Sequence, residues 1–157
     1  MNAKEIERDI YSTFADIASA IGYSEIHGRI IAALLVSNKK LSLNELAKKT
    51  GYSLSTISLS LDLLEFLGMI KKIKKAGDRK LYVELQGNLL EGLKKAFLMR
   101  IQKSINETLN KFDKYKENLE KSKSKEDKKV LNILNILEEE VESVDKYINL
   151  LSKLKLQ

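Results

Sequence analysis

The stretch "SLSTISLSLDLL", Ser53 to Leu64, decides the fold, and by itself it fits two kinds of secondary structure. Its second half alternates leucine with serine, which is the period of a half-buried strand. On a helix of about 100° per residue, however, four of its apolar residues share one arc of about 80°, as a buried helix face would. Those four residues are Leu54, Ile57, Leu61 and Leu64.

The segment just before this stretch, "LSLNELAKKTGYS", has the end signals of two consecutive helices. Ser42 and Glu45 have the spacing of a capping box, and Gly51 is typical of the residue that follows a last helical turn. Ser53 then offers a second N-cap, which a strand would leave unused. We therefore predict a short helix, a tight turn and a second helix over about residues 53–67, stopped by Gly68.

Apolar spacing predicts four more helices. Residues Ile6 to Ile21 carry an apolar stripe that ends at Gly22, and a polar connector over residues 120–129 separates a long helix starting near Asn88 from a last one. That last helix has a heptad pattern from Val130 to Leu151, widened by further apolar residues. One more helix follows Ser24, with five residues expected inward: Ile26, Ile30, Ile31, Leu34 and Leu35.

After Gly68 the period changes to that of strands. Residues 69–85 read as two strands around "AGDR", which fits a two-residue type II′ turn with Gly77 and Asp78 at its centre. The same residues hold six basic and two acidic side chains in a chain whose formal net charge is +6. This is the densest positive charge in the sequence, and it suits a polyanionic partner at one place.

Composition limits the remaining possibilities. The chain has no Cys and one His, so thiolate metal sites are excluded and we expect neither a metal nor a cofactor. His27 is expected to be a partly buried helix residue, and the acidic run Glu138–Asp145 a solvated or interhelically paired face. No apolar run approaches the roughly 18 residues of a membrane span and no signal peptide is evident, which favours a cytoplasmic protein.

The order of these elements predicts a mainly α fold with a small β wing, a winged helix-turn-helix with long dimerisation helices. We expect an N-terminal dimerisation helix over residues 1–23, a DNA-binding domain over residues 24–87 and a helical dimerisation arm over residues 88–157. In this fold the second helix of the pair enters the major groove and presents its N-terminal residues to base edges.

The candidate DNA contacts follow from this docking. The outward face of residues 53–67 shows hydroxyls and apolar side chains, but no Lys or Arg stands between Leu54 and Met69. Charge must therefore come from the wing, residues 71–80, and from lysines near the first helix of the pair, so we expect largely electrostatic binding with modest base readout. The candidates are Lys39, Lys40, Lys48, Lys49, Tyr52, Ser53, Ser55, Thr56, Leu59, Lys72, Lys74, Lys75, Gly77, Asp78, Arg79 and Lys80.

Residues from about 25 to 85 resemble the MarR-like winged-helix regulators, especially their GbsR-like branch. The resemblance is carried by Gly51, Ser53, the Ile57/Leu61/Leu64 spacing, Gly68, Ile70 and the wing "GDRK", Gly77 to Lys80. It implies a homodimeric regulator of transcription that binds pseudo-palindromic double-stranded DNA, often under the control of a small-molecule effector. By motif position, Arg79 would reach the minor groove and Asp78 would orient it.

Two other classes remain open. Leu59, Leu63 and Phe66 on the outward helix face would also suit a protein-interaction adaptor that uses the winged helix and a coiled arm. An enzyme is the least favoured class, because no catalytic set of residues stands out. A steep fall of DNA affinity with salt would separate a regulator from an adaptor.

Overall fold

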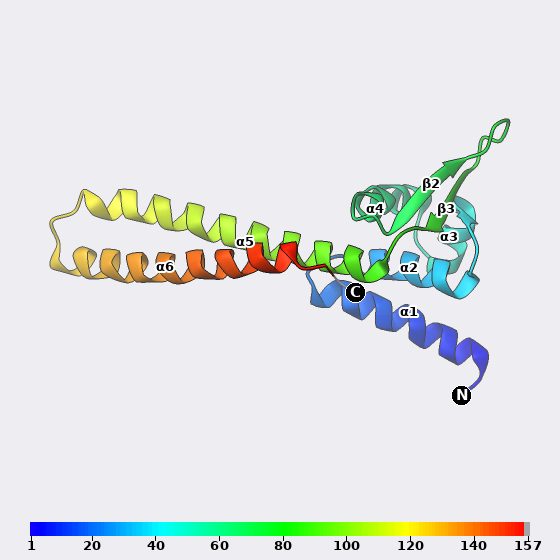
Figure 1. The fold of residues 1–157 in the computed structure, drawn as a ribbon, viewed down its shortest axis with the longest axis horizontal. Helices are drawn as coiled ribbons and strands as arrows, with labels where there is room; N and C mark the ends of the chain where they lie inside the picture. Colours follow the sequence, from blue (N-terminus) through cyan, green and yellow to red (C-terminus); the bar gives the residue numbers. More distant parts are fainter. Residues whose placement is uncertain (156–157) are drawn as a thin grey trace. The chain divides into compact units, whose positions relative to one another are not determined.

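The structure, a computed structural model, describes residues 1–155 and divides into two compact units, Met1–Ala96 and a second that begins at Phe97 (Figure 1). The prediction of a mainly α fold with a small antiparallel sheet is confirmed. No helix among the described residues combines the length and apolar character that crossing a bilayer requires. The elements are α1 (Ala3–Ala20), α2 (Glu25–Ser37), β1 (Leu41–Ser42), α3 (Leu43–Thr50), α4 (Leu54–Phe66), β2 (Ile70–Lys74), β3 (Leu81–Leu85), α5 (Leu89–Glu120) and α6 (Lys125–Lys153).

Helices α1 and α2 pack closely because Gly28 of α2 has no side chain. A Cβ at Gly28 would lie 1.9 Å from the carbonyl oxygen of Phe14 in α1. The residues of α1 that are buried are Ala15 and Ala18. The compact unit Met1–Ala96 therefore includes α1 together with the elements of the predicted DNA-binding domain.

The apolar stripe of α1 is only partly covered within the chain. Ile6 and Ile17 of the predicted stripe are exposed. On α2, Ile26, Ile30 and Leu34 are buried as expected, together with Ile31, but Leu35 is exposed and its predicted inward position is wrong. Helical spacing identified the helices correctly. It did not show which apolar residues of each stripe are buried against a neighbouring helix.

The local end signals of α3 behave as predicted. Ser42 Oγ accepts a hydrogen bond from the Glu45 backbone N–H (3.2 Å), and the Glu45 carboxylate accepts one from the Ser42 N–H (2.7 Å). Gly51 takes a left-handed conformation with φ +80° and its N–H donates to the Ala47 carbonyl (2.9 Å). These bonds satisfy backbone groups that the ends of a helix leave without partners.

The stretch that decides the fold is a helix. Ser53 is the N-cap of α4, and its Oγ accepts a hydrogen bond from the Thr56 N–H (3.2 Å). Ile57, Leu61 and Leu64 are buried as predicted, but Leu54 is 46% exposed and does not belong to the buried face.

The sheet contains one strand more than predicted. The sheet has the order β1-β3-β2, and the short β1 pairs with β3 through Leu41 opposite Val83. The predicted two-residue turn is wrong, because β2 and β3 last pair at Lys74 and Leu81 and leave a loop over residues 75–80. The turn within that loop is closed by the Asp78 N–H donating to the Lys75 carbonyl (3.1 Å), with Gly77 at its third position and φ +79°. A positive φ at the third position is what a type II turn requires of glycine.

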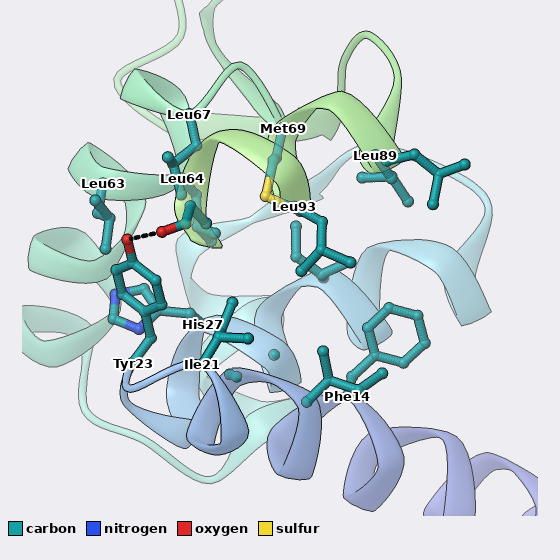
Figure 2. A pocket seen from close by; sticks show the side chains of 16 residues that line it. Phe14, Ile21, Tyr23, His27, Leu63, Leu64, Leu67, Met69, Leu89 and Leu93 are labelled. Atoms are coloured by element: carbon teal, nitrogen blue, oxygen red, sulfur yellow. Dashed lines mark hydrogen bonds between the residues drawn. The ribbon is translucent and has the colours of Figure 1, made fainter. Parts of the chain in front are cut away.

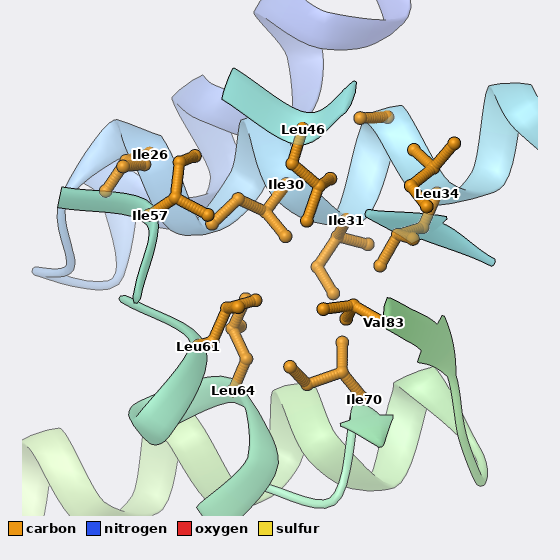
Figure 3. Packing of buried hydrophobic residues seen from close by; sticks show 12 residues of the cluster. Ile26, Ile30, Ile31, Leu34, Leu46, Ile57, Leu61, Leu64, Ile70 and Val83 are labelled. Carbon is orange, nitrogen blue, oxygen red and sulfur yellow. The ribbon is translucent and has the colours of Figure 1, made fainter. Parts of the chain in front are cut away.

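One apolar core holds the helices to the sheet (Figure 3). Side chains from α2, α3, α4 and all three strands converge there, and eight large ones are almost completely buried. Burying each such side chain contributes about 1.5–3 kcal/mol of gross stabilisation. The eight are Ile30, Leu34, Leu41, Leu46, Ile57, Leu61, Ile70 and Val83.

The second unit is an antiparallel pair formed by α6 and most of α5. Lys116 of α5 forms an ion pair with Glu138 of α6, and the Gln102 amide donates to the Asp145 carboxylate (2.6 Å). The acidic run of α6 is therefore partly used in pairing between the helices. The polar connector is shorter than predicted, because Ser124 already caps α6 by accepting from the Glu126 N–H (3.2 Å). Of the predicted heptad positions Leu134 and Ile148 are buried, whereas Val130, Leu137, Val144 and Leu151 are exposed.

Candidate nucleic-acid interface

The N-terminal turn of α4 displays a hydroxyl cluster, which we define as Ser53, Ser55 and Thr56. All three residues are exposed. Ser53 Oγ lies 3.1 Å from Ser55 Oγ and 2.7 Å from Thr56 Oγ1, so the hydroxyls form one hydrogen-bonded group. Hydroxyls bond equally to phosphate oxygens and base edges, and the positive end of the helix dipole lies at the same turn. The cluster was predicted from the sequence, although its internal bonding was not.

Farther along α4, two large apolar side chains are exposed. Leu59 is 74% exposed and Phe66 is 59% exposed, while Tyr52, just before the helix, is half-buried. Ser60 had no predicted role, and it is buried with its hydroxyl donating to the Thr56 carbonyl (2.9 Å). Leu59 is a candidate for contact with a thymine methyl group, which is the apolar feature of the major groove.

The β2–β3 hairpin carries five exposed basic side chains. They are Lys71, Lys74, Lys75, Arg79 and Lys80. The Lys75 ammonium lies 5.2 Å from the centre of the Tyr82 ring. At that distance the cation is attracted to the ring face. Within the first unit, exposed positive charge is densest in the wing, as the sequence predicted.

Asp78 supports the backbone of the wing and does not hold Arg79. Its carboxylate accepts hydrogen bonds from the Lys80 N–H (2.9 Å) and from the Tyr82 hydroxyl (3.4 Å). No ion pair joins Asp78 to Arg79 among the residues that the structure describes. The ion pair by which Asp78 was expected to orient Arg79 is therefore not formed among the described residues, and Arg79 is exposed.

Lys72 differs from the other wing lysines. Its ammonium forms an ion pair with Asp62 and lies 3.7 Å from Glu65, both on α4. The hydrogen bond to Asp62 raises the pKa of Lys72 above its ordinary value, although partial burial opposes the shift. The sequence missed the role of Asp62 and Glu65, because only the packing of β2 against α4 brings them to Lys72.

The lysines near α3 are exposed, and one of them is paired. Lys39, Lys40, Lys48 and Lys49 all reach solvent, and the Lys39 ammonium lies 3.8 Å from the Glu45 carboxylate. The hydrogen bonds that Glu45 accepts from the Ser42 backbone and side chain hold the pKa of Glu45 below its usual value. Glu45 is thus an anion held by its helix cap, and Lys39 is its nearest counter-ion.

An apolar pocket of about 350 Å³ lies in the first unit beside α4 (Figure 2). It is lined from α1, α2, α4 and the first turns of α5, so no single stretch of sequence announces it. Leu63, Leu64 and Leu67 line it from α4, the helix that also carries the hydroxyl cluster. Other residues around it include Phe14, Ile21, His27, Met69 and Leu93.

Two aromatic residues place polar atoms beside this pocket. The Tyr23 hydroxyl donates to the Ala96 carbonyl (2.7 Å), the bond drawn as a dashed line in Figure 2. The His27 ring packs edge-on against the Tyr23 ring at 6.2 Å, and its Nδ1 lies 3.0 Å from the Ser24 carbonyl. Because a carbonyl only accepts, Nδ1 carries the proton in the neutral ring. Burial lowers the pKa of His27, so the partly buried histidine predicted from the sequence is neutral at physiological pH.

Comparison with known proteins gives likenesses only among solved structures. A scan of family models and a search of curated proteins both find no match. A structure described as a transcriptional regulator shares 21% identity over 90% of this chain and 97% of that one, with a TM-score of 0.49. NadR in complex with 4-hydroxyphenylacetate shares 20% identity over 87% of each chain, with a TM-score of 0.43. A mutant of S. aureus MepR bound to an oligodeoxyribonucleotide shares 19% identity over 85% of this chain and 91% of that one, with a TM-score of 0.44.

None of the three is close enough in sequence or superposition to place this chain in a family or in the GbsR-like branch.

Proposed function

We propose that the chain is a regulator of transcription that binds double-stranded DNA, with α4 in the major groove and the wing against the phosphate backbone and minor groove. One observation carries this proposal: the capped, hydroxyl-rimmed start of α4 is exposed, and the β2–β3 hairpin packed beside α4 bears five exposed basic side chains. Hydroxyls can approach a groove closely, and lysines and arginine can release counter-ions from phosphates.

The expected binding is electrostatic, with limited base readout. Helix α4 has no Lys or Arg, so it lacks the commonest specific contact, Arg to guanine. Ser55 and Thr56 can bond to base edges and Leu59 can contact thymine methyls, which gives a preference of modest size. No set of catalytic residues accompanies this surface, and we propose a cytoplasmic binding protein and not an enzyme.

Dimerisation would place two such surfaces on one operator. The exposed apolar residues of α1 and of α6 are candidates for burial between two copies, among them Ile6, Ile17, Ile133 and Ile136. In a symmetric dimer the two copies of α4 would lie about one DNA turn apart, roughly 34 Å, which requires a two-fold operator. The N-terminal helix and the α5–α6 arm are proposed as the dimerising parts.

The apolar pocket gives the proposed regulator a place for an effector. Its wall is shared with α4, so a ligand that separates α4 from α1 or α5 would change how the hydroxyl cluster is presented. Because the lining is almost wholly apolar, the ligand should be neutral and hydrophobic; a buried carboxylate without a cation would be costly there. DNA affinity measured with indole or benzyl alcohol should change, whereas benzoate should have little effect. If no such ligand altered DNA affinity, effector control would be abandoned.

A second candidate function is a protein-interaction adaptor, favoured by the exposure of Leu59 and Phe66 on α4. Salt separates the two functions. Affinity for random duplex fragments should fall with salt along a log–log slope of about −0.9 for each phosphate contact. An adaptor would not bind duplexes even in dilute buffer. Selection of bound fragments from random DNA would then show whether a two-fold sequence is preferred.

Arg79→Ala tests the wing directly. If Arg79 makes a good minor-groove contact, its loss should weaken DNA binding by about 1–3 kcal/mol. Fluorescence anisotropy with a labelled duplex measures this. Arg29→Ala, which removes a partly exposed arginine from α2, outside the proposed DNA and dimer contacts, is the matched control. Equal affinities for the two variants would remove the wing tip from the interface.

A further inference from the structure

Three charged side chains meet where β2 packs against α4. The Lys72 ammonium donates to the Asp62 carboxylate and lies 3.7 Å from Glu65 Oε1. The Lys72 backbone N–H also donates to Glu65 Oε2 at 3.2 Å. Because β2 is an edge strand, this N–H would otherwise face solvent, and Glu65 gives it a fixed partner. The wing is thus tied to α4 by a side-chain bond and by a backbone bond.

The two carboxylates of this group lie on the exposed surface of the candidate recognition helix. The Asp62 side chain is 70% exposed and that of Glu65 45%, whereas the Lys72 side chain is only 25% exposed. Within residues 1–155, Lys72 is the ion-pair partner of both carboxylates. Helix α4 itself supplies no cation, since it contains neither Lys nor Arg.

Such a pair of anions would oppose DNA binding if it were left uncompensated. Like charges within a Debye length, about 10 Å at 0.1 M salt, still repel one another across the surface. A docked phosphate backbone would stand at that range from the exposed side of α4. The carboxylates are tolerable on this face because a cation is already bonded to them.

We propose that Lys72 is a positioning residue and not a phosphate ligand: it neutralises Asp62 and Glu65 and fixes the wing to α4, so that both meet DNA as one body. This inference rests on the proposed DNA-binding function and revises the sequence-based prediction that Lys72 contacts DNA. The raised pKa of Lys72 agrees with an ammonium held by its carboxylate partners. Lys74, two residues along the same strand, is exposed without an ion pair among the described residues and is a phosphate contact by the same reasoning.

The test compares the loss of Lys72 in two backgrounds, with DNA affinity measured over a range of salt. In the native background Lys72→Met should weaken binding about tenfold at low salt, since it leaves two carboxylates beside phosphate. In a background that already carries Asp62→Asn and Glu65→Gln, Lys72→Met should change DNA affinity little. Glu65→Gln keeps an oxygen that can accept from the Lys72 N–H, so the backbone bond is retained. Lys72→Arg should bind like the native chain.

Lys74→Met is the matched control for a true phosphate contact. It should weaken binding equally in both backgrounds and reduce the magnitude of the salt slope by about 0.9. Lys72→Met should leave that slope close to its native value once the carboxylates are neutralised. Should the native-background variant fail to fold, the comparison within the neutralised background still decides the question.

The outcomes separate this inference from the function it rests on. If Lys72→Met behaves like Lys74→Met, with a reduced slope and no rescue by the neutral background, Lys72 is a phosphate ligand and the inference is wrong while DNA binding stands. If the native chain binds no duplex at any salt concentration, the proposed function itself is wrong.

Discussion

At the scale of single residues, Gly28 shows how one absent Cβ sets the packing of a whole helix. Gly28→Ala would place a Cβ 1.9 Å from the Phe14 carbonyl oxygen, so α1 must move. We expect the free energy of unfolding to fall by about 1–3 kcal/mol, as overpacked cores do, although alanine normally favours a helix. Urea denaturation measures the change.

Gly92→Ala is the matched control for that substitution. Its new Cβ would lie 2.3 Å from Cγ of Met69, a flexible side chain that can turn away. Gly92→Ala should therefore lower the free energy of unfolding clearly less than Gly28→Ala does. Similar stability of the two variants and the native chain would contradict the close contact between α1 and α2.

His27 makes stability depend on pH in one direction. Because burial lowers the pKa of His27 below its ordinary 6.5, the unfolded chain binds the proton more readily than the folded one. The neutral His27 ring therefore makes its whole contribution to the free energy of unfolding above pH 6.5. This contribution is lost as the pH falls from 6.5 through the lower pKa of the folded state. Urea midpoints at about pH 7.5 and about pH 5.5 should differ more for the native chain than for His27→Gln. As the chain has one His, an unchanged difference would mean that other groups cause it.

At the scale of elements, the capping box of α3 is a local device with a separable effect. Ser42→Ala should lower the free energy of unfolding by about 1 kcal/mol, since it removes the acceptor for the Glu45 N–H. Ser58→Ala, on the exposed side of α4, serves as the control and should be close to neutral. A neutral effect of Ser42→Ala would mean that packing of Leu41 and Leu46 alone holds the start of α3.

The elements also show how far the sequence could predict this structure. Caps depend on residues three or four positions apart, so Ser42, Glu45, Gly51 and Ser53 could be read directly. The two-residue β1 could not, because its pairing with β3 joins residues some forty positions apart and leaves no period in the sequence. The turn type failed for a related reason: the residues between the two strands have no period of their own, and only the pairing of Lys74 with Leu81 shows that the loop covers residues 75–80.

The candidate site was predictable in composition but not in its internal bonds. A count of lysines located the wing, and a helical wheel located Ser55, Thr56 and Leu59. Neither could show that Lys72 is bonded to Asp62 or that Asp78 holds the Lys80 N–H in place of Arg79. Such choices depend on which element packs beside which, and they decide which charges remain available to a partner.

At the scale of the whole molecule, apolar surface remains that one chain does not cover. Ile136 of α6 is 59% exposed, and Ile133 and Leu150 on the same helix are also exposed. Large apolar residues gathered on the exposed side of one helix mark a surface that a partner buries. Since the proposed operator is two-fold, a second copy of the chain is the partner expected here.

Ile136→Asp tests this at the level of assembly. The charge should be tolerated in an isolated chain, where the position is already exposed, but it should weaken a dimer that buries it, because burying an unpaired carboxylate is costly. Sedimentation equilibrium should show a dimer for the native chain and a shift toward monomer for the variant, with unchanged circular dichroism. DNA affinity should fall as the dimer dissociates, because each half-site would then be bound by a single copy.

Asn135→Asp, which places the same charge at the neighbouring exposed residue, is the control. A native chain that sediments as a monomer would contradict both the buried face and the two-fold operator.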